Sequence, residues 1–162
     1  MRKGRVGLVS LLCSALILGF WSIAWSHCEI PCGIYNDPMR INMLEEHVMT
    51  IEKSMNQIKE LSGHQSSEDV SQGHKHQVES QHQLVRWIVN KEEHAKKFQN
   101  VVWQYFMTQR VKPGDKNYEQ KVTLLHQMLY YAMKCKQTTD TDHVKKLMNL
   151  IDQFEKVYFQ KK

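Results

Sequence analysis

The sequence predicts an all-α protein whose body, residues 37–162, is an up-down-up-down four-helix bundle. Glycine and proline, which interrupt helices, number only 7 and 3 among 162 residues. Apolar residues recur at steps of three and four in four separate segments, and this spacing places them on one face of a helix. The connections between these segments are short, which favours antiparallel neighbours. A short cysteine-containing segment and an apolar leader precede the bundle.

The leader, residues 1–26, has the features of a cleavable signal peptide. Its first five residues carry three basic side chains and no acidic one, and residues 6–25 are an almost unbroken apolar run. Ala24 and Ser26 place small side chains three and one residues before His27, which is the pattern that a signal peptidase reads. The sequence therefore predicts cleavage directly before His27.

An uncleaved membrane anchor is the alternative for this leader, because an apolar run of roughly 20 residues is long enough to span a bilayer. We favour cleavage by signal peptidase because the small-residue site lies immediately before His27. The mature chain is then a single domain, residues 27–162, exported to the periplasm or the extracellular space. No stable membrane association is expected after cleavage.

Charge and cysteine content narrow the class of protein. The formal net charge is +5, but the leader holds three of the 22 basic residues and none of the 17 acidic ones. The mature chain is therefore only slightly basic, which argues against a nucleic-acid partner. Its cysteines are Cys28, Cys32 and Cys135. An odd number in an exported protein favours metal binding or burial over a disulfide framework.

The first helix of the bundle is predicted to begin at Asp37, which can cap it, with Pro38 at its first position. It is predicted to end at Ser62-Gly63, and residues 62–79, rich in Ser, Gln and His, are predicted to form a loop. The apolar stripe of this helix consists of Ile41, Leu44, Val48, Ile51, Met55 and Ile58.

Three further helices follow. The second covers about residues 80–110 and ends before a Lys-Pro-Gly-Asp break. The third begins at Asn117, where Gln120 can complete a capping box, and it carries Cys135 as a small buried residue. The fourth begins at the turn 138–140. The apolar stripes are Leu84, Ile88, Ala95, Phe98, Val102 and Tyr105; Tyr118, Val122, Leu125, Leu129 and Ala132; and Val144, Leu147, Ile151, Phe154 and Tyr158.

The segment between leader and bundle concentrates metal donors. After cleavage, the amine of His27, the amide nitrogen and sulfur of Cys28, and the sulfur of Cys32 supply two nitrogens and two sulfurs in one plane. Such a set favours nickel(II) or copper(II), whereas zinc prefers a tetrahedron. The His27 imidazole can take an axial position. Thiolates and an amidate stabilise a higher oxidation state, so nickel can cycle between II and III.

This hook, residues 27–35, resembles the N-terminal nickel hook of the nickel superoxide dismutase family. It reads His-Cys-Glu-Ile-Pro-Cys-Gly-Ile-Tyr, and the family pattern is His-Cys-x-x-Pro-Cys-Gly-x-Tyr, so every fixed position matches. The resemblance implies a homohexamer with one nickel ion per subunit that disproportionates superoxide to oxygen and hydrogen peroxide. It implies that His27, Cys28 and Cys32 bind the nickel. It places Tyr35 beside the open axial site, where the hydroxyl orders water or the small anion.

Three positions depart from the family pattern. In the family, a glutamate on the first helix and an arginine on the second help to hold the axial histidine. Approximate alignment puts Asn42 at the glutamate position and His94 at the arginine position. Within the hook, Glu29 stands where an aspartate is common. Because outer partners tune a metal site, we expect these differences to affect the axial bond.

Other interpretations fit parts of the sequence. A non-enzymatic nickel or copper carrier would use the same terminal chelate but would not need Tyr35 or the Pro-Cys-Gly turn before it. A membrane-tethered helical interaction protein would keep its leader. Cys28 and Cys32 could form a local disulfide, although the adjacent His27 favours metal ligation. Histidines in and beside the polar loop form no recognisable site, namely His64, His74, His76 and His82.

Overall fold

The computed structural model of the protein describes residues 33–64 and 73–160. The leader and the predicted ligands His27, Cys28 and Cys32 lie outside these residues. The chain divides into two units, Met1–Tyr35 and Asn36–Lys162, and every described helix belongs to the second unit.

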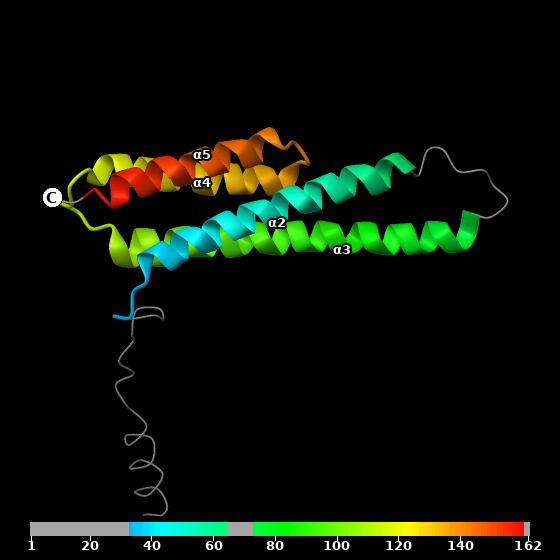
Figure 1. The fold of residues 1–162 in the computed structure, drawn as a ribbon, viewed down its shortest axis with the longest axis horizontal. Helices are drawn as coiled ribbons and strands as arrows, with labels where there is room; N and C mark the ends of the chain where they lie inside the picture. Colours follow the sequence, from blue (N-terminus) through cyan, green and yellow to red (C-terminus); the bar gives the residue numbers. More distant parts are fainter. Residues whose placement is uncertain (1–32, 65–72, 161–162) are drawn as a thin grey trace, which may run out of the picture. The chain divides into compact units, whose positions relative to one another are not determined.

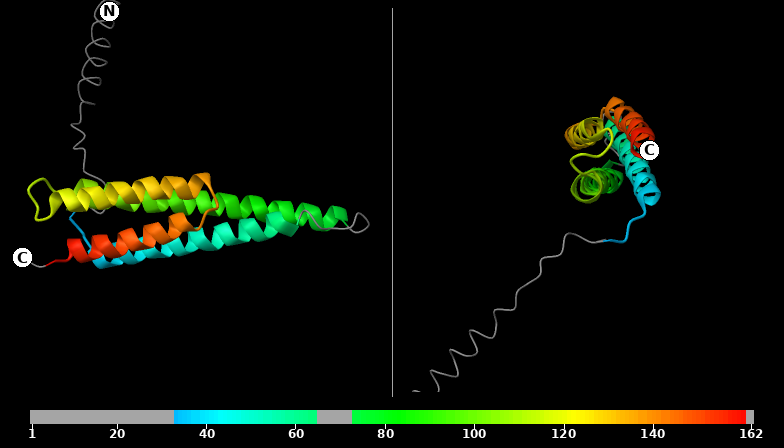
Figure 2. Two further views of the ribbon diagram at one scale, coloured as in Figure 1. Left: turned by 90° about the horizontal axis from the view of Figure 1, so that it is seen from above. Right: turned by 90° about the vertical axis from the view of Figure 1, so that its left-hand side faces the viewer.

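The regular secondary structure in the described part of the second unit is all helical, as the sequence predicts (Figure 1). Its helices are α2 (Asp37–His64), α3 (Gly73–Asn100), a π-helix η1 (Val101–Arg110) that continues α3, α4 (Tyr118–Gln137) and α5 (Asp142–Tyr158). Successive long helices run in opposite directions, and the α2–α3 pair packs against the α4–α5 pair (Figures 1 and 2). Residues 33–64 and 73–160 contain no strand. The predicted all-α four-helix bundle is confirmed.

The core lies between the two helix pairs. The predicted stripe of α2 is buried at every position, from Ile41 to Ile58. Near one end, the rings of Phe106 and Phe154 meet edge to face with their centroids 5.0 Å apart. Cys135 of α4 is fully buried, as predicted, and burial raises the pKa of its thiol to about 12. This thiol is therefore a neutral part of the core at pH 7.

The prediction that Ile88 of α3 is buried in the core is wrong, because its side chain is 40% exposed. The ammonium of Lys91, one turn later, donates hydrogen bonds to the carbonyls of Lys136 (2.6 Å) and Thr138 (3.2 Å), at the end of α4. The C-terminal end of α4 therefore lies beside Lys91 of α3. The part of α3 before Lys91 runs beyond α4 and α5 (Figure 1), so neither of those helices covers Ile88.

The predicted loop 62–79 is too long at both ends. α2 continues to His64, and α3 already begins at Gly73. The Ser62 hydroxyl donates to the Ile58 carbonyl over 2.7 Å, so this polar side chain is accommodated inside the helix. Lys, Gln and Glu, which are frequent at the start of α3, are good helix formers. Polar composition was therefore a poor indicator of a loop here.

Two predicted helix caps also differ. Asn36, not Asp37, caps α2, because its side-chain oxygen accepts a hydrogen bond from the Met39 N–H over 3.1 Å. Asn117 precedes α4 with φ of +59° and makes no side-chain cap bond, so the predicted capping box is absent. Its side-chain amide donates instead to the Gln160 side chain, over 3.3 Å. The cap of α2 is shifted by one residue, from Asp37 to Asn36. At α4, the Asn117 side chain makes a tertiary contact with Gln160 instead of capping the helix.

Candidate metal centre

The structure describes the last three residues of the hook, beginning at Gly33. This residue has φ of +78°, a left-handed conformation that favours glycine. A Cβ at this position would meet no heavy atom within 4 Å, so the backbone angle, not a close contact, accounts for glycine here. The Tyr35 side chain is 40% exposed. Nickel ligation by His27, Cys28 and Cys32 stays a prediction, because these residues lie outside the described part.

Two residues after Tyr35, Asp37 ties the first turn of α2 to η1 and α5. Its carboxylate accepts hydrogen bonds from the Tyr105 hydroxyl (2.6 Å) and the Tyr158 hydroxyl (2.9 Å). The Arg110 guanidinium donates two more, from Nε over 2.8 Å and from Nη2 over 2.6 Å. The end of the bundle that is joined to the hook is therefore held by three other side chains through one carboxylate.

The π-helix explains how Tyr105 and Arg110 reach the same carboxylate. In an α-helix, with 3.6 residues per turn, residues five apart point about 140° away from each other. In a π-helix each N–H bonds the carbonyl five residues earlier, so residues five apart face the same side of the helix. The N–H of Val111 donates to the Phe106 carbonyl over 2.8 Å in this pattern. The sequence predicts a helix to Arg110 but not this change of pitch.

The hydrogen bonds to Asp37 decide its protonation. Burial alone would raise the pKa of this carboxyl, but the hydrogen bonds from Arg110, Tyr105 and Tyr158 outweigh burial and hold the pKa below 3.8. Burial and the carboxylate together raise the pKa of Tyr105 to about 12. At neutral pH the cluster therefore holds one carboxylate, one guanidinium and two neutral phenols.

We expect Asp37→Asn to destabilise the protein by about 2 kcal/mol at pH 7, because the amide cannot replace a charged acceptor for Arg110. The folded pKa of Asp37 lies below its unfolded value, so its contribution is fully present above about pH 4 and is lost as the pH falls through the folded pKa. Urea unfolding at pH 7 and at lower pH measures both effects.

The matched control is Asp142→Asn, which breaks the exposed pair between Asp142 and Lys145. We expect no measurable change in the urea midpoint for that variant, because exposed pairs contribute little. Equal midpoints for Asp37→Asn and the wild type at pH 7 would show that the Asp37 contacts add no stability.

The two bundle positions that depart from the family pattern lie on α2 and α3. Asn42 is exposed. His94 lies against His47 of α2, with their Nδ1 atoms 3.2 Å apart and their ring planes at 78°. Burial lowers the pKa of both imidazoles and the nearby Lys97 ammonium lowers it further, so both rings are neutral at pH 7. No motif in the sequence indicates this pair, because the two histidines are 47 residues apart.

Within residues 33–64 and 73–160, no group of three or more His, Cys, Asp or Glu side chains is arranged to hold a metal ion. In the same part of the chain, none of the helices has both the length and the apolar character that crossing a bilayer requires.

A protein-family model matches most of the chain. The family model described as nickel-containing superoxide dismutase matches residues 22–162. The match covers the whole bundle and all of the hook, and it begins five residues before His27. No curated protein and no solved structure matches the chain.

Proposed function

This chain belongs to the nickel-containing superoxide dismutase family, and from that premise we propose that His27, Cys28 and Cys32 hold its nickel ion. As a member of this family it is a nickel-dependent oxidoreductase, which converts two superoxide ions and two protons to oxygen and hydrogen peroxide. Bound nickel supplies this chemistry by alternating between oxidation states II and III. Membership of this family supports the interpretation as an enzyme over that as a non-enzymatic metal carrier.

One observation supports the proposed ligands most strongly. The donors stand at the residue where a signal-peptide cut would create a new N-terminus, and they lie inside the region that the family model matches. A free amine, a backbone amide and two thiolates are a suitable set for nickel, because nitrogen and sulfur donors in a plane suit its divalent state. His27 would supply both the amine and the axial imidazole.

The remaining residues of the hook would shape the space beside the metal. We propose that the Tyr35 hydroxyl would order a water molecule or the superoxide ion beside the bound nickel. The left-handed backbone at Gly33 supports a sharp turn between the second thiolate and Tyr35. Asp37, held by Arg110 and two tyrosines, would anchor the chain only five residues after Cys32.

We also propose that a signal peptidase removes residues 1–26 and that the mature protein is exported and assembles as a homohexamer. Apolar side chains that remain exposed on a single chain support assembly, since a subunit contact would cover them. They include Val85 and Val89 on α3 and Trp103 on η1, which are 57%, 49% and 44% exposed.

The mature protein should begin at His27 by intact mass, sediment as a hexamer and hold about one nickel ion per chain. A chelator that removes nickel should abolish superoxide loss. Returning nickel should restore it, whereas zinc should not, because zinc has no redox chemistry. Superoxide loss that persists in nickel-free protein would show that the reaction does not need nickel, and a fully active monomer would refute the assembly.

A further inference from the structure

Two identical tripeptides face each other across the bundle. Glu-Glu-His occurs at Glu45–His47 on α2 and again at Glu92–His94 on α3. The two imidazoles meet with their Nδ1 atoms 3.2 Å apart and their ring centroids 5.1 Å apart. Neither tripeptide lies within the hook, residues 27–35.

The separation of the two nitrogens suits a shared metal ion. With metal–nitrogen bonds of about 2.0–2.1 Å, a nitrogen–nitrogen distance of 3.2 Å corresponds to an N–metal–N angle of about 100–105°. This angle is close to tetrahedral. Burial lowers the pKa of both rings, so their lone pairs are available at neutral pH.

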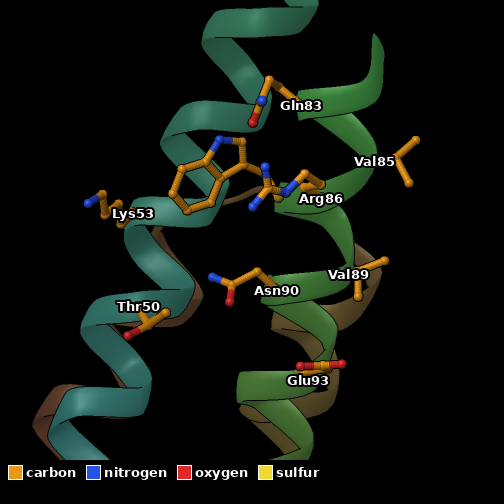
Figure 3. A pocket seen from close by; sticks show the side chains of 9 residues that line it. Thr50, Lys53, Gln83, Val85, Arg86, Val89, Asn90 and Glu93 are labelled. Carbon is orange, nitrogen blue, oxygen red and sulfur yellow. The ribbon is translucent and has the colours of Figure 1, made fainter. Parts of the chain in front are cut away.

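The pair opens onto a groove that can admit an ion with its water ligands. A cavity of about 330 Å³ is lined by Glu46, His47, Met49, Thr50, Lys53 and His94. Thr50 and Lys53 also line a larger groove of about 670 Å³ between α2 and α3, which reaches Glu93. Figure 3 shows this larger groove, with Thr50 and Lys53 on α2 opposite Asn90 and Glu93 on α3.

We propose that His47 and His94 form a second metal site, separate from the hook, for a divalent ion of the zinc type. The two imidazoles supply two ligands, and no third His, Cys, Asp or Glu of the described residues stands ready beside them. Water completes the coordination, together with the exposed carboxylates of Glu46 and Glu93 when they turn inward. The same two nitrogens share one N–H···N hydrogen bond when the ion is absent.

The surrounding charges make this a site of moderate affinity. Glu46 and Glu93 lie close enough to His47 and His94 to affect their protonation, and both attract a cation. The ammonium of Lys97 opposes a cation at both histidines, and Lys53 lines the cavity. An ion held by two imidazoles in this setting exchanges with solvent more readily than one held by thiolates.

Zinc binding tests the proposal in the mature chain with His27→Gln, Cys28→Ser and Cys32→Ser, which removes the donors of the hook. Equilibrium dialysis against Zn²⁺ should find one zinc ion bound per chain, and this binding should require both His47 and His94. His47→Gln and His94→Gln should each weaken zinc binding at least about tenfold, and the double change should weaken it no less. The thermal midpoint of the background protein should rise with added zinc, because the ion binds only the folded pair.

The matched control is His126→Gln, because His126 is an exposed histidine of α4. It should bind zinc as the background protein does. Circular dichroism of each variant without zinc checks that the helices remain. If His47→Gln binds zinc as tightly as His126→Gln and shows the same rise in midpoint, the proposal is wrong. Nickel binding by the intact hook is measured separately, so failure here leaves the proposed function standing.

Discussion

Replacing Cys28 or Cys32 by serine is expected to abolish nickel binding and superoxide dismutation together. A serine hydroxyl stays protonated at neutral pH and is a hard, weak donor, whereas a cysteine thiolate is the soft donor that this site needs. Each change therefore removes a sulfur from the proposed four-donor set. Metal analysis and superoxide loss, measured on the same sample, should both fall to the level of nickel-free protein.

Cys135, the third cysteine of residues 27–162, provides the matched control. Cys135→Ser makes the same chemical change in the core of α4, far along the chain from the hook. A buried hydroxyl lowers stability by about 1–3 kcal/mol but removes no nickel donor. This variant should keep its nickel and its activity per folded chain. Wild-type activity in Cys28→Ser or Cys32→Ser would exclude these residues as ligands.

Replacing the His27 side chain should affect nickel binding and catalytic turnover differently. His27→Gln keeps the terminal amine and the amide of Cys28, so it should retain much of its nickel. It removes the imidazole that we propose as a further nickel ligand and that the alternation between two oxidation states would require. Nickel that remains bound while superoxide loss disappears is the expected result. If activity is retained in this variant, the imidazole is not a catalytic ligand.

Removal of the leader is expected to activate the enzyme. In the uncut chain the nitrogen of His27 belongs to the peptide bond with Ser26, and an amide nitrogen is hardly basic. A free α-amine has a pKa of about 7.7–8.0 and gives its lone pair to a metal readily near neutral pH. Even one residue left before His27 should therefore reduce nickel binding and activity to near background.

A removable tag before residue 27 allows this test on one protein sample. Nickel content and superoxide loss are measured before tag removal, after it, and after incomplete removal that leaves one methionine. Only the fully processed sample should be active. Metal-free thiolates are open to oxidation, so the samples are kept reduced until nickel is added. Equal activity before and after removal would show that the free amine is not a ligand.

The sequence was sufficient for the parts of this protein that depend on local pattern. The hook motif is continuous in the chain, so His27, Cys28 and Cys32 can be proposed as nickel ligands without knowing the fold. The apolar stripe from Ile41 to Ile58 follows helical periodicity, and every predicted position proved buried. Such features need only the spacing of residues along one segment.

The tertiary structure alone decided the features that join distant segments. Tyr105 and Arg110 meet Asp37 only because η1 changes helical pitch, and Tyr158 reaches the same carboxylate from the end of the chain. Ile88 fits a buried stripe but is exposed, because burial depends on the lengths of α4 and α5 and not on the periodicity of α3. Facing histidines on α2 and α3 are 47 residues apart in sequence. Periodicity shows which face of a helix is apolar, but only packing determines what lies opposite it.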